Sequence, residues 1–559
     1  MDPISASAFN LHVEENARAL LEEKQKAEQE FREIIVSCKS LSYYESKRFK
    51  SLIPQIFACF IAASFHIVVG IALAYSAILV PQLEANNSDI SVTKSQSSWI
   101  ASLIVVAVPF GSMLGGFLME AFGRLNTIKV AALPGMAGWT LIANATNIEM
   151  LIIGRLLTGL AAALGTSPAI VYITEVARAD LRGSLIAAAP TFASLGMVIA
   201  YLKGWYMSWR LVAWLSNIYT IVPAIMIFII PESPIWLVSK GKIEEAAKSL
   251  AWINKYQPQP INKNETLAEM QLAALQKEHE SKLSEQKNQK LLTRMKGFTK
   301  PTGYKPLLIL MGLFVFQQFS GIYITLFYAV TFFEAVGSDV DAYLASILIG
   351  TVRLIMSVFN TWMLKRFKRR PLVMTSAAGM AICMAVSGLY TLWIHEKKTT
   401  LTWVPVVCIL LYVVTSMIGL LTIPWTMTAE LFPTDIRGLA HSVAYSIANL
   451  IMFASVQSYR DLSRLLGGSH GVQWFFAAVS VAGMIYAWIF LPETHGKKLI
   501  EIQQYFETNT IYLGQEKKKR KAALLKDPKK NPIVIASRVT DDDVKQAKIG
   551  QKEKMINSV

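Results

Sequence analysis

The side chains best suited to chemistry in this chain are acids and arginines that recur at a fixed spacing. An acid stands seven residues before an Arg-Gly pair at Glu175 and Arg182, and the same spacing returns at Glu430 and Arg437. The two copies are 255 residues apart. Opposite charges in a tight interface cost desolvation and separate easily when water enters, so such pairs suit a reversible gate.

The rest of the chain offers no constellation typical of an enzyme. It contains no Gly-rich phosphate loop and no nucleophile elbow, and its seven histidines are scattered. The four cysteines lack the spacing of metal ligands; they are Cys38, Cys59, Cys383 and Cys408. We therefore expect no catalytic residue, no cofactor, no metal and no disulfide.

The composition indicates the elements that must position these charges. With 53% hydrophobic residues, 17% charged residues and a mean hydropathy of +0.38 over 559 residues, the chain is typical of a protein in a lipid bilayer. Its net charge of +16 comes from Lys and Arg in the tails and between apolar runs, where membrane proteins carry cytoplasmic basic residues. We therefore expect the lipid bilayer as a partner, and no nucleic acid.

Twelve apolar runs are long enough to cross a ~30 Å hydrocarbon core as helices. Together with the duplicated motif, they predict an all-α integral membrane protein of two six-helix bundles. Twelve spans place both termini on one side, and the Lys and Arg distribution makes that side cytoplasmic. The spans lie at about 56–80, 99–121, 127–144, 149–172, 184–203, 210–230, 306–333, 342–364, 371–393, 402–428, 439–459 and 471–491.

These spans divide the chain into five predicted parts at the plasma membrane. The first outer loop also carries an Asn-X-Ser acceptor sequence at Asn86, which predicts a glycan there. The parts are a cytoplasmic N-terminal segment (1–50), an N-terminal six-helix bundle (51–231), a cytoplasmic helical linker (232–305), a C-terminal six-helix bundle (306–491) and a cytoplasmic C-terminal tail (492–559).

Seven motifs follow one another along the chain. They are GGFLMEAFGR (Gly115–Arg124), GRLLTGLAAALG (Gly154–Gly165), YITEVARADLRG (Tyr172–Gly183), PESPIWL (Pro231–Leu237), QQFSG (Gln317–Gly321), IPWTMTAELFPTDIRG (Ile423–Gly438) and PETHGKKL (Pro492–Leu499). Over nearly all of residues 50–506 they resemble the sugar-porter family of the major facilitator superfamily. Details such as SSWI at Ser97 are similar to its insect trehalose-transporter branch. The resemblance implies the major facilitator fold, a small-molecule solute such as a hexose or trehalose, and a monomer.

Alternating access in such a fold requires a gate that closes the cytoplasmic side. We assign the charged motif residues to this gate. The alternative is that they are ordinary cytoplasmic charges that follow the positive-inside rule. Lys365 departs from the family, which usually has an acid at that position. The predicted gate consists of Arg124, Arg155, Glu175 and Arg182 from the first half and Arg369, Arg370, Glu430 and Arg437 from the second.

The resemblance also implies a solute site, and this chain departs from the family there. Gln317, Gln318 and Trp425 match family positions that supply hydrogen bonds and an aromatic face, while Tyr323 replaces an Asn. Interhelical hydrogen bonding is the alternative role for the two glutamines. Arg353 falls about where the eighth helix commonly offers Asn, roughly 16 Å into its span. A guanidinium at that depth costs at least ~2.5 kcal/mol unless it faces water or a partner. Arg353 therefore either selects an anionic solute or a sugar that accepts several hydrogen bonds, or it packs against helix-end carbonyls or snorkels.

Three functions remain open on the sequence alone. The first is a facilitative sugar carrier, a uniporter because the first span has no acid and acids elsewhere fall at helix ends. The second is a carrier of a non-sugar or anionic organic solute on the same scaffold. The third is a sensor that binds a nutrient without moving it.

Overall fold

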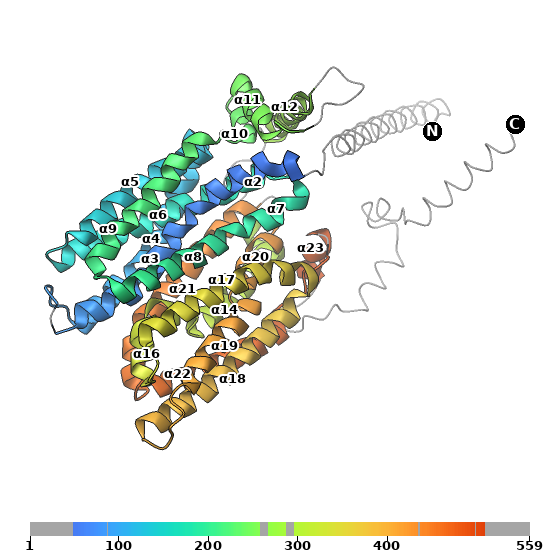
Figure 1. Ribbon diagram of the computed structural model, residues 1–559. Coiled ribbons are helices and arrows are strands. Elements are labelled where there is room, and N and C mark those ends of the chain that lie inside the picture. The colour runs from blue at the N-terminus through green and yellow to red at the C-terminus, as the bar shows by residue number, and fades with distance from the viewer. Residues whose placement is uncertain are drawn as a thin grey trace, which may run out of the picture.

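The computed structural model describes residues 49–86, 88–257, 266–286, 296–433, 436–497 and 499–508. Every regular element in these residues is a helix, and the helices form two groups that lie side by side (Figure 1). The predicted N-terminal segment up to residue 48, with Cys38, and the tail after residue 508 lie outside the described residues.

The first group, the N half, holds the first six predicted spans. Side chains define where its helices begin: Thr93 and Gln96 form a capping box before α4, and Asn147 caps α6. The helices are α2 (Phe49–Ser64), α3 (His66–Glu84), α4 (Lys94–Phe122), α5 (Arg124–Ala143), α6 (Ile148–Val176), α7 (Ala179–Ile186), α8 (Ala188–Tyr206) and α9 (Trp209–Met226).

The second group, the C half, holds the other six predicted spans and ends in a short helix that packs back on it. Lys305 near the start of α14 donates a hydrogen bond to the Phe506 carbonyl of that last helix at 2.8 Å. The helices are α14 (Pro301–Phe319), α15 (Ile324–Phe327), α16 (Ala329–Val336), α17 (Ala342–Arg366), α18 (Arg369–His395), α19 (Val404–Ile418), α20 (Ile423–Glu430), α21 (Arg437–Leu465), α22 (Ser469–Phe490) and α23 (Leu499–Thr508).

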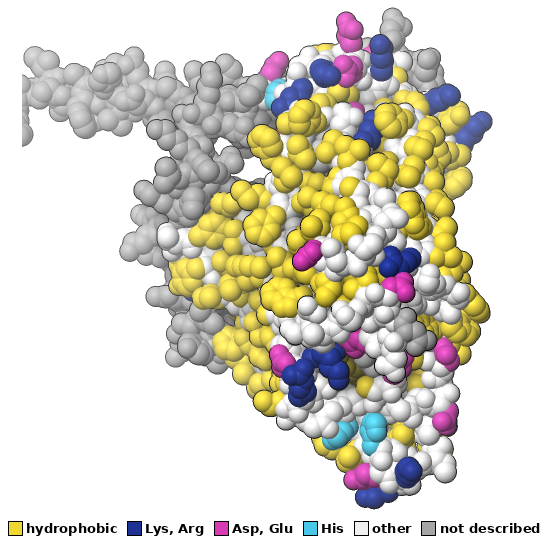
Figure 2. All heavy atoms as spheres, turned by 90° about the vertical axis from the view of Figure 1, so that its left-hand side faces the viewer, with side chains coloured by type: hydrophobic (Ala, Val, Ile, Leu, Met, Phe, Trp, Pro, Cys, Tyr) yellow, Lys and Arg dark blue, Asp and Glu magenta, His cyan; other side chains and the backbone are white. Residues whose placement is uncertain are grey.

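Eleven helical segments in the described residues are long and apolar enough to cross a membrane. Helix α5 takes the place of the remaining predicted span but is not among them, because Arg124, Asn126 and Lys129 make its first turns polar. Its 20 residues still reach about 30 Å. Hydrophobic side chains cover much of the surface in Figure 2, as lipid exposure requires.

Two predicted continuous spans are interrupted in the structure. The span predicted at 306–333 breaks between α14 and α15, where Gly321 has a φ of +90° that only glycine adopts easily. The span predicted at 402–428 breaks between α19 and α20 at Gly419, where a Cβ atom would lie 2.3 Å from the Leu372 carbonyl oxygen. Broken helices leave backbone groups unpaired within the membrane, so other parts of the protein must bind them.

The charged motifs lie at one end of the molecule, which we call the motif end. Arg124 and Arg369 begin α5 and α18, while Glu175 and Glu430 lie at the ends of α6 and α20. The predicted linker forms α10 (Pro234–Ser239), α11 (Ile243–Ile253), α12 (Leu267–Gln286) and the 3-10 helix η2 (Lys296–Thr299). Figure 1 shows α10, α11 and α12 beside the start of α2, at the motif end. We call the other end the distal end.

Candidate functional site

At the motif end of the N half, an ion pair joins α5 to α6. The Arg124 guanidinium donates to both carboxylate oxygens of Glu175, with Nε–Oε2 at 3.0 Å and Nη2–Oε1 at 2.8 Å. Both side chains are largely buried, at 9% and 13% exposure. The Ser233 hydroxyl also donates to Glu175. A charge-assisted, bidentate ion pair of this kind fixes the start of α5 relative to the end of α6.

A second acid, Glu232, caps the start of α5 beside that pair. Its carboxylate accepts hydrogen bonds from the backbone amides of Arg124 at 3.1 Å and Leu125 at 3.0 Å. A carboxylate at a helix N-terminus pairs free amides and favours the helix dipole. Burial nevertheless raises the pKa of Glu232 above its ordinary value, because these amides only partly offset the desolvation.

The C half repeats the same arrangement. Arg369 Nη2 lies 3.1 Å from Glu430 Oε1, and the Thr494 hydroxyl donates to Glu430 at 2.6 Å. Glu493 accepts from the backbone amides of Arg369 at 2.9 Å and Arg370 at 3.2 Å at the start of α18. The sequence duplication is therefore a duplication of structure, and it includes Glu232 and Glu493, which the predicted gate omitted although the Pro-Glu-Ser and Pro-Glu-Thr repeats mark them.

The motif residues pair within each half, whereas the predicted gate required pairing between halves. Arg370 donates to the Trp488 carbonyl of its own half, and Arg437 Nε to the Phe432 carbonyl at 3.4 Å. Arg182 is exposed. Among the polar contacts of the described residues, the one between halves near this end joins Lys365 Nζ to the Ser184 hydroxyl at 3.0 Å.

Arg155 does not belong to this cluster, so its assignment to the cytoplasmic gate was wrong. It lies seven residues after the start of α6, toward the distal end, whereas Glu175 lies near the other end of the same helix. Arg155 is fully buried and donates to the carbonyls of Ile100 at 3.2 Å and Ala72 at 3.0 Å. Its guanidinium therefore ties α3, α4 and α6 together inside the N half.

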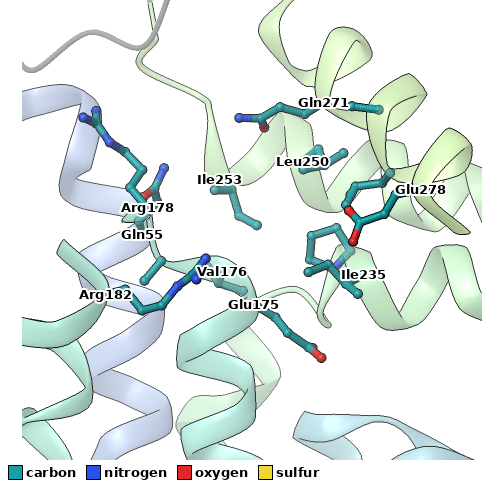
Figure 3. A pocket seen from close by; sticks show the side chains of 14 residues that line it. Gln55, Glu175, Val176, Arg178, Arg182, Ile235, Leu250, Ile253, Gln271 and Glu278 are labelled. Atoms are coloured by element: carbon teal, nitrogen blue, oxygen red, sulfur yellow. The ribbon is translucent and has the colours of Figure 1, made fainter. Parts of the chain in front are cut away.

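A pocket lies beside the N-half cluster, between the bundle and the linker helices (Figure 3). Its volume is about 270 Å³. Glu175 and Arg182 line it from the bundle, and Gln271 and Glu278 line it from α12. The linker helices thus share a wall with the motif cluster. Within the described residues, no group of three or more His, Cys, Asp or Glu side chains could hold a metal ion.

At the distal end, contacts that the sequence did not predict join the two halves. Arg460 of α21 forms an ion pair with Glu84 of α3 at 2.5 Å, with exposures of 13% and 23%. The Ser97 hydroxyl of α4 donates to the same carboxylate, and the Arg460 guanidinium lies 5.8 Å from the Tyr328 ring centre. One helical turn or more deeper, the Ser102 hydroxyl of α4 donates to Gln457 of α21 at 2.7 Å.

The predicted solute residues gather at the two helix breaks. Gln317 Nε2 donates to the carbonyls of Leu420 and Leu421, both at 2.8 Å, and these carbonyls lie in the break between α19 and α20. Gln318 Nε2 donates to Gln317 Oε1 at 3.2 Å, and its own Oε1 is buried without a partner within the described part of the chain. Both glutamines are fully buried. In this conformation Gln317 therefore makes interhelical hydrogen bonds, which was the alternative to a role in solute binding.

An aromatic cluster, which we define as Phe314, Tyr323, Trp425 and Tyr445, draws on both breaks, because Tyr323 precedes α15 and Trp425 lies in the first turn of α20. The Trp425 ring lies 4.8 Å from that of Phe314 and 5.3 Å from that of Tyr445. The Tyr323 side chain is hydrogen bonded to Trp425. Tyr445 is the member that sequence reasoning missed, since nothing local in α21 marks it. Trp425 and Tyr323 are only partly buried, so the cluster keeps accessible ring surface.

Arg353 lies next to this cluster and faces the N half. It interacts electrostatically with the phenol groups of Tyr323 and of Tyr201 on α8. Tyr201 itself crosses between the halves, because its hydroxyl donates to the Leu326 carbonyl of α15 at 2.9 Å. The structure therefore brings Tyr323, Arg353 and Trp425 together where the halves meet. Asn86, the predicted glycan site, is exposed two residues beyond α3 at the distal end.

Comparisons with known proteins agree with this arrangement. A family model described as sugar (and other) transporter matches residues 58–506. The facilitated trehalose transporter Tret1 of Apis mellifera ligustica is 32% identical over 455 residues, which cover 81% of this chain and 88% of that protein. Tret1 of Drosophila yakuba is 32% identical over 453 residues, and there the matched part spans 80% of this chain but only 51% of the relative.

Solved structures show the same fold. The proton:xylose symporter XylE bound to 6-bromo-6-deoxy-D-glucose has a TM-score of 0.62 at 23% identity and covers 82% of this chain and 100% of its own. An inward-open conformation of the xylose transporter XylE from E. coli has a TM-score of 0.65 at 22% identity, with coverages of 80% and 99%. The predicted all-α fold of two membrane bundles is confirmed.

Proposed function

This chain belongs to the sugar (and other) transporter family, and we propose that it carries a sugar across a membrane by alternating access. It is a multi-pass integral membrane protein, and its family consists of transporters rather than enzymes. The observation that supports the proposal best is the pair of helix breaks, α14/α15 and α19/α20, where buried amides and aromatic rings gather and where Tyr201 of the N half bonds to α15. Discontinuous helices facing the partner half are where transporters of this architecture bind their solutes.

The side chains at the breaks suit the two faces of a sugar. We propose that Trp425 and Tyr323 cover the apolar face of the ring, while Gln317 and Gln318 bind its hydroxyl groups. Gln318 Oε1 is already a buried acceptor that no described residue binds. Gln317 becomes available only if a hydroxyl replaces its bond to Leu420 or Leu421, so solute binding and rearrangement of the broken α19/α20 helix are coupled.

The two ends of the molecule then act as gates of different construction. We propose that the motif cluster of each half keeps the helix ends of that half rigid. When the motif end closes, Lys365 and neighbouring residues contact the other half. Glu84 and Arg460 close the distal end directly by joining the halves. Because an ion pair in a partly buried interface separates once water enters, this contact can be made and broken in each cycle.

We propose that the transport is uniport. Proton coupling commonly uses a carboxyl group inside the membrane, and in the described spans the acids lie near helix ends, as Glu84, Glu120 and Glu334 do. Purified protein in proteoliposomes should therefore accumulate radiolabelled glucose or trehalose down its gradient. A protonophore at fixed membrane potential should leave the initial rate unchanged. Rates no higher than in empty liposomes for every sugar would refute sugar transport, whereas collapse with the protonophore would refute uniport alone.

We place the motif end in the cytoplasm of a plasma-membrane monomer. Basic residues concentrate at that end, and both ends of the described chain, α2 and α23, lie there. Tags at either terminus should consequently be reached by antibody only after cells are permeabilised. Asn86 would then face outward, and an endoglycosidase should increase the gel mobility of the wild type but not of Asn86→Gln. Antibody access in intact cells would contradict this orientation.

A further inference from the structure

Arg353 lies on the face of α17 that packs against the N half. Three positions along that face are one or two turns apart: Gly350, Arg353 and Ser357. A Cβ atom at Gly350 would lie 3.3 Å from Tyr201 of α8, and the Ser357 hydroxyl donates to the Thr191 hydroxyl of α8 at 3.1 Å. Arg353 is thus between two contacts that join the halves, eleven residues into a 25-residue helix.

No acidic side chain in the described part of the chain pairs with the Arg353 guanidinium. No ion pair or hydrogen bond among the described residues involves it, and its Nε atom is buried without a partner. The groups that face it are the phenols of Tyr201 and Tyr323, which are neutral donors or acceptors. An unpaired guanidinium at mid-membrane depth is costly unless a partner arrives from elsewhere, and intramembrane ionisable residues usually mark a solute pathway.

We propose that Arg353 determines specificity by binding the carboxylate of an acidic sugar, such as a hexuronate. This inference rests on the proposed function and names its solute class. The planar guanidinium can donate two parallel hydrogen bonds to one carboxylate in bidentate geometry. The neighbouring Trp425 and Tyr323 rings supply the surface that a pyranose ring requires. One fixed positive charge also neutralises one carboxylate, whereas a doubly charged phosphate would leave excess negative charge in the site.

The test compares two solutes that differ only at C6, D-glucose and D-glucuronate. Full-length protein in proteoliposomes is assayed by counterflow of each labelled solute, and binding is followed separately in detergent by quenching of tryptophan fluorescence. The wild type should prefer glucuronate. Arg353→Asn should lower the glucuronate-to-glucose ratio by about ten- to a hundredfold, the range expected for losing a hydrogen bond to a charged group. Arg353→Lys should fall between them, because it keeps the charge without the fork.

Arg366→Asn is the matched control, since Arg366 is an exposed arginine at the end of the same helix. The glucuronate-to-glucose ratio of the Arg366→Asn variant should equal that of the wild type. A wild type that moves glucose but neither moves nor binds glucuronate overturns the inference and leaves the proposed sugar transport intact. An unchanged ratio in Arg353→Asn also overturns it, and if that variant does not fold, the wild-type preference and Arg353→Lys decide. Failure to move or bind either solute overturns this inference, whereas the proposed sugar transport is overturned only if every other sugar also fails to move.

Discussion

Replacing Arg124 with alanine is expected to abolish transport and to lower the free energy of unfolding by about 3–5 kcal/mol. The change leaves the Glu175 carboxylate, only 13% exposed, without its cation. It also removes the bond that holds the start of α5 to the end of α6. Thermal unfolding of the purified protein in detergent, together with proteoliposome uptake, measures both effects. A variant as stable as the wild type would contradict a structural role for the motif cluster.

The second half of the molecule offers a graded comparison. Arg369→Ala should cost less than Arg124→Ala, because the Arg369–Glu430 pair is more exposed, at 14% and 30%, and has one hydrogen bond rather than a fork. Adding Glu175→Ala to Arg124→Ala should recover part of the loss, since no buried charge then remains unpaired. Lys242→Ala is the control: its pair with Glu245 is 49% and 57% exposed, so the expected change is below about 1 kcal/mol.

Replacing Glu84 with glutamine is expected to open the distal end. The substitution keeps the side-chain shape but removes the charge that binds Arg460 across the halves. Close charge pairs at interfaces contribute about 1.5 kcal/mol or more, so the population open at this end should rise at least about tenfold. Spin labels at Asn86→Cys and Leu465→Cys report it, because both positions are exposed at the distal end, one in each half. Their distance distribution should shift to longer values.

Two further variants show whether the longer label distances at the distal end depend on this ion pair. Glu396→Gln removes another distal carboxylate, whose partner Lys398 lies in the same half and is 64% exposed, so the label distances should not change. Exchanging the charges, Glu84→Arg with Arg460→Glu, should restore part of the closed population. If Glu84→Gln leaves the distances of the wild type unchanged, Ser102, Gln457 and their neighbours close the distal end without the ion pair.

The fold was predictable because its signals are local. Apolar length located the helices, and the repeat at Glu175 and Glu430 identified two halves with the same cluster in each. The helix breaks had signals too, in Gly321 and Gly419, but hydropathy alone does not distinguish a broken span from a continuous one. The motif that contains Arg155 led to its wrong assignment to the cytoplasmic gate. Its position early in a span that is predicted to enter from the outer side already argued against that assignment.

The candidate site was less predictable because it depends on contacts between distant residues. Glu84 and Arg460 are 376 residues apart, and nothing near either one in the sequence indicates a partner. Gln317 was found by its motif, but only the structure shows that the broken α19/α20 helix occupies its amide. Whether an arginine or a glutamine in a membrane helix faces a solute or a carbonyl is decided by packing, which a single sequence does not contain.

If the two halves open alternately around one solute site, distances at the two ends of the same protein must change in opposite directions. Gly183→Cys and Gly438→Cys provide a motif-end pair with one label in each half, and an added Cβ atom meets no close contact at either position. The second pair is the distal one, Asn86→Cys with Leu465→Cys. When a transported solute is added, we expect one distance to lengthen as the other shortens. Distances that stay fixed, or that lengthen together, would contradict alternating access.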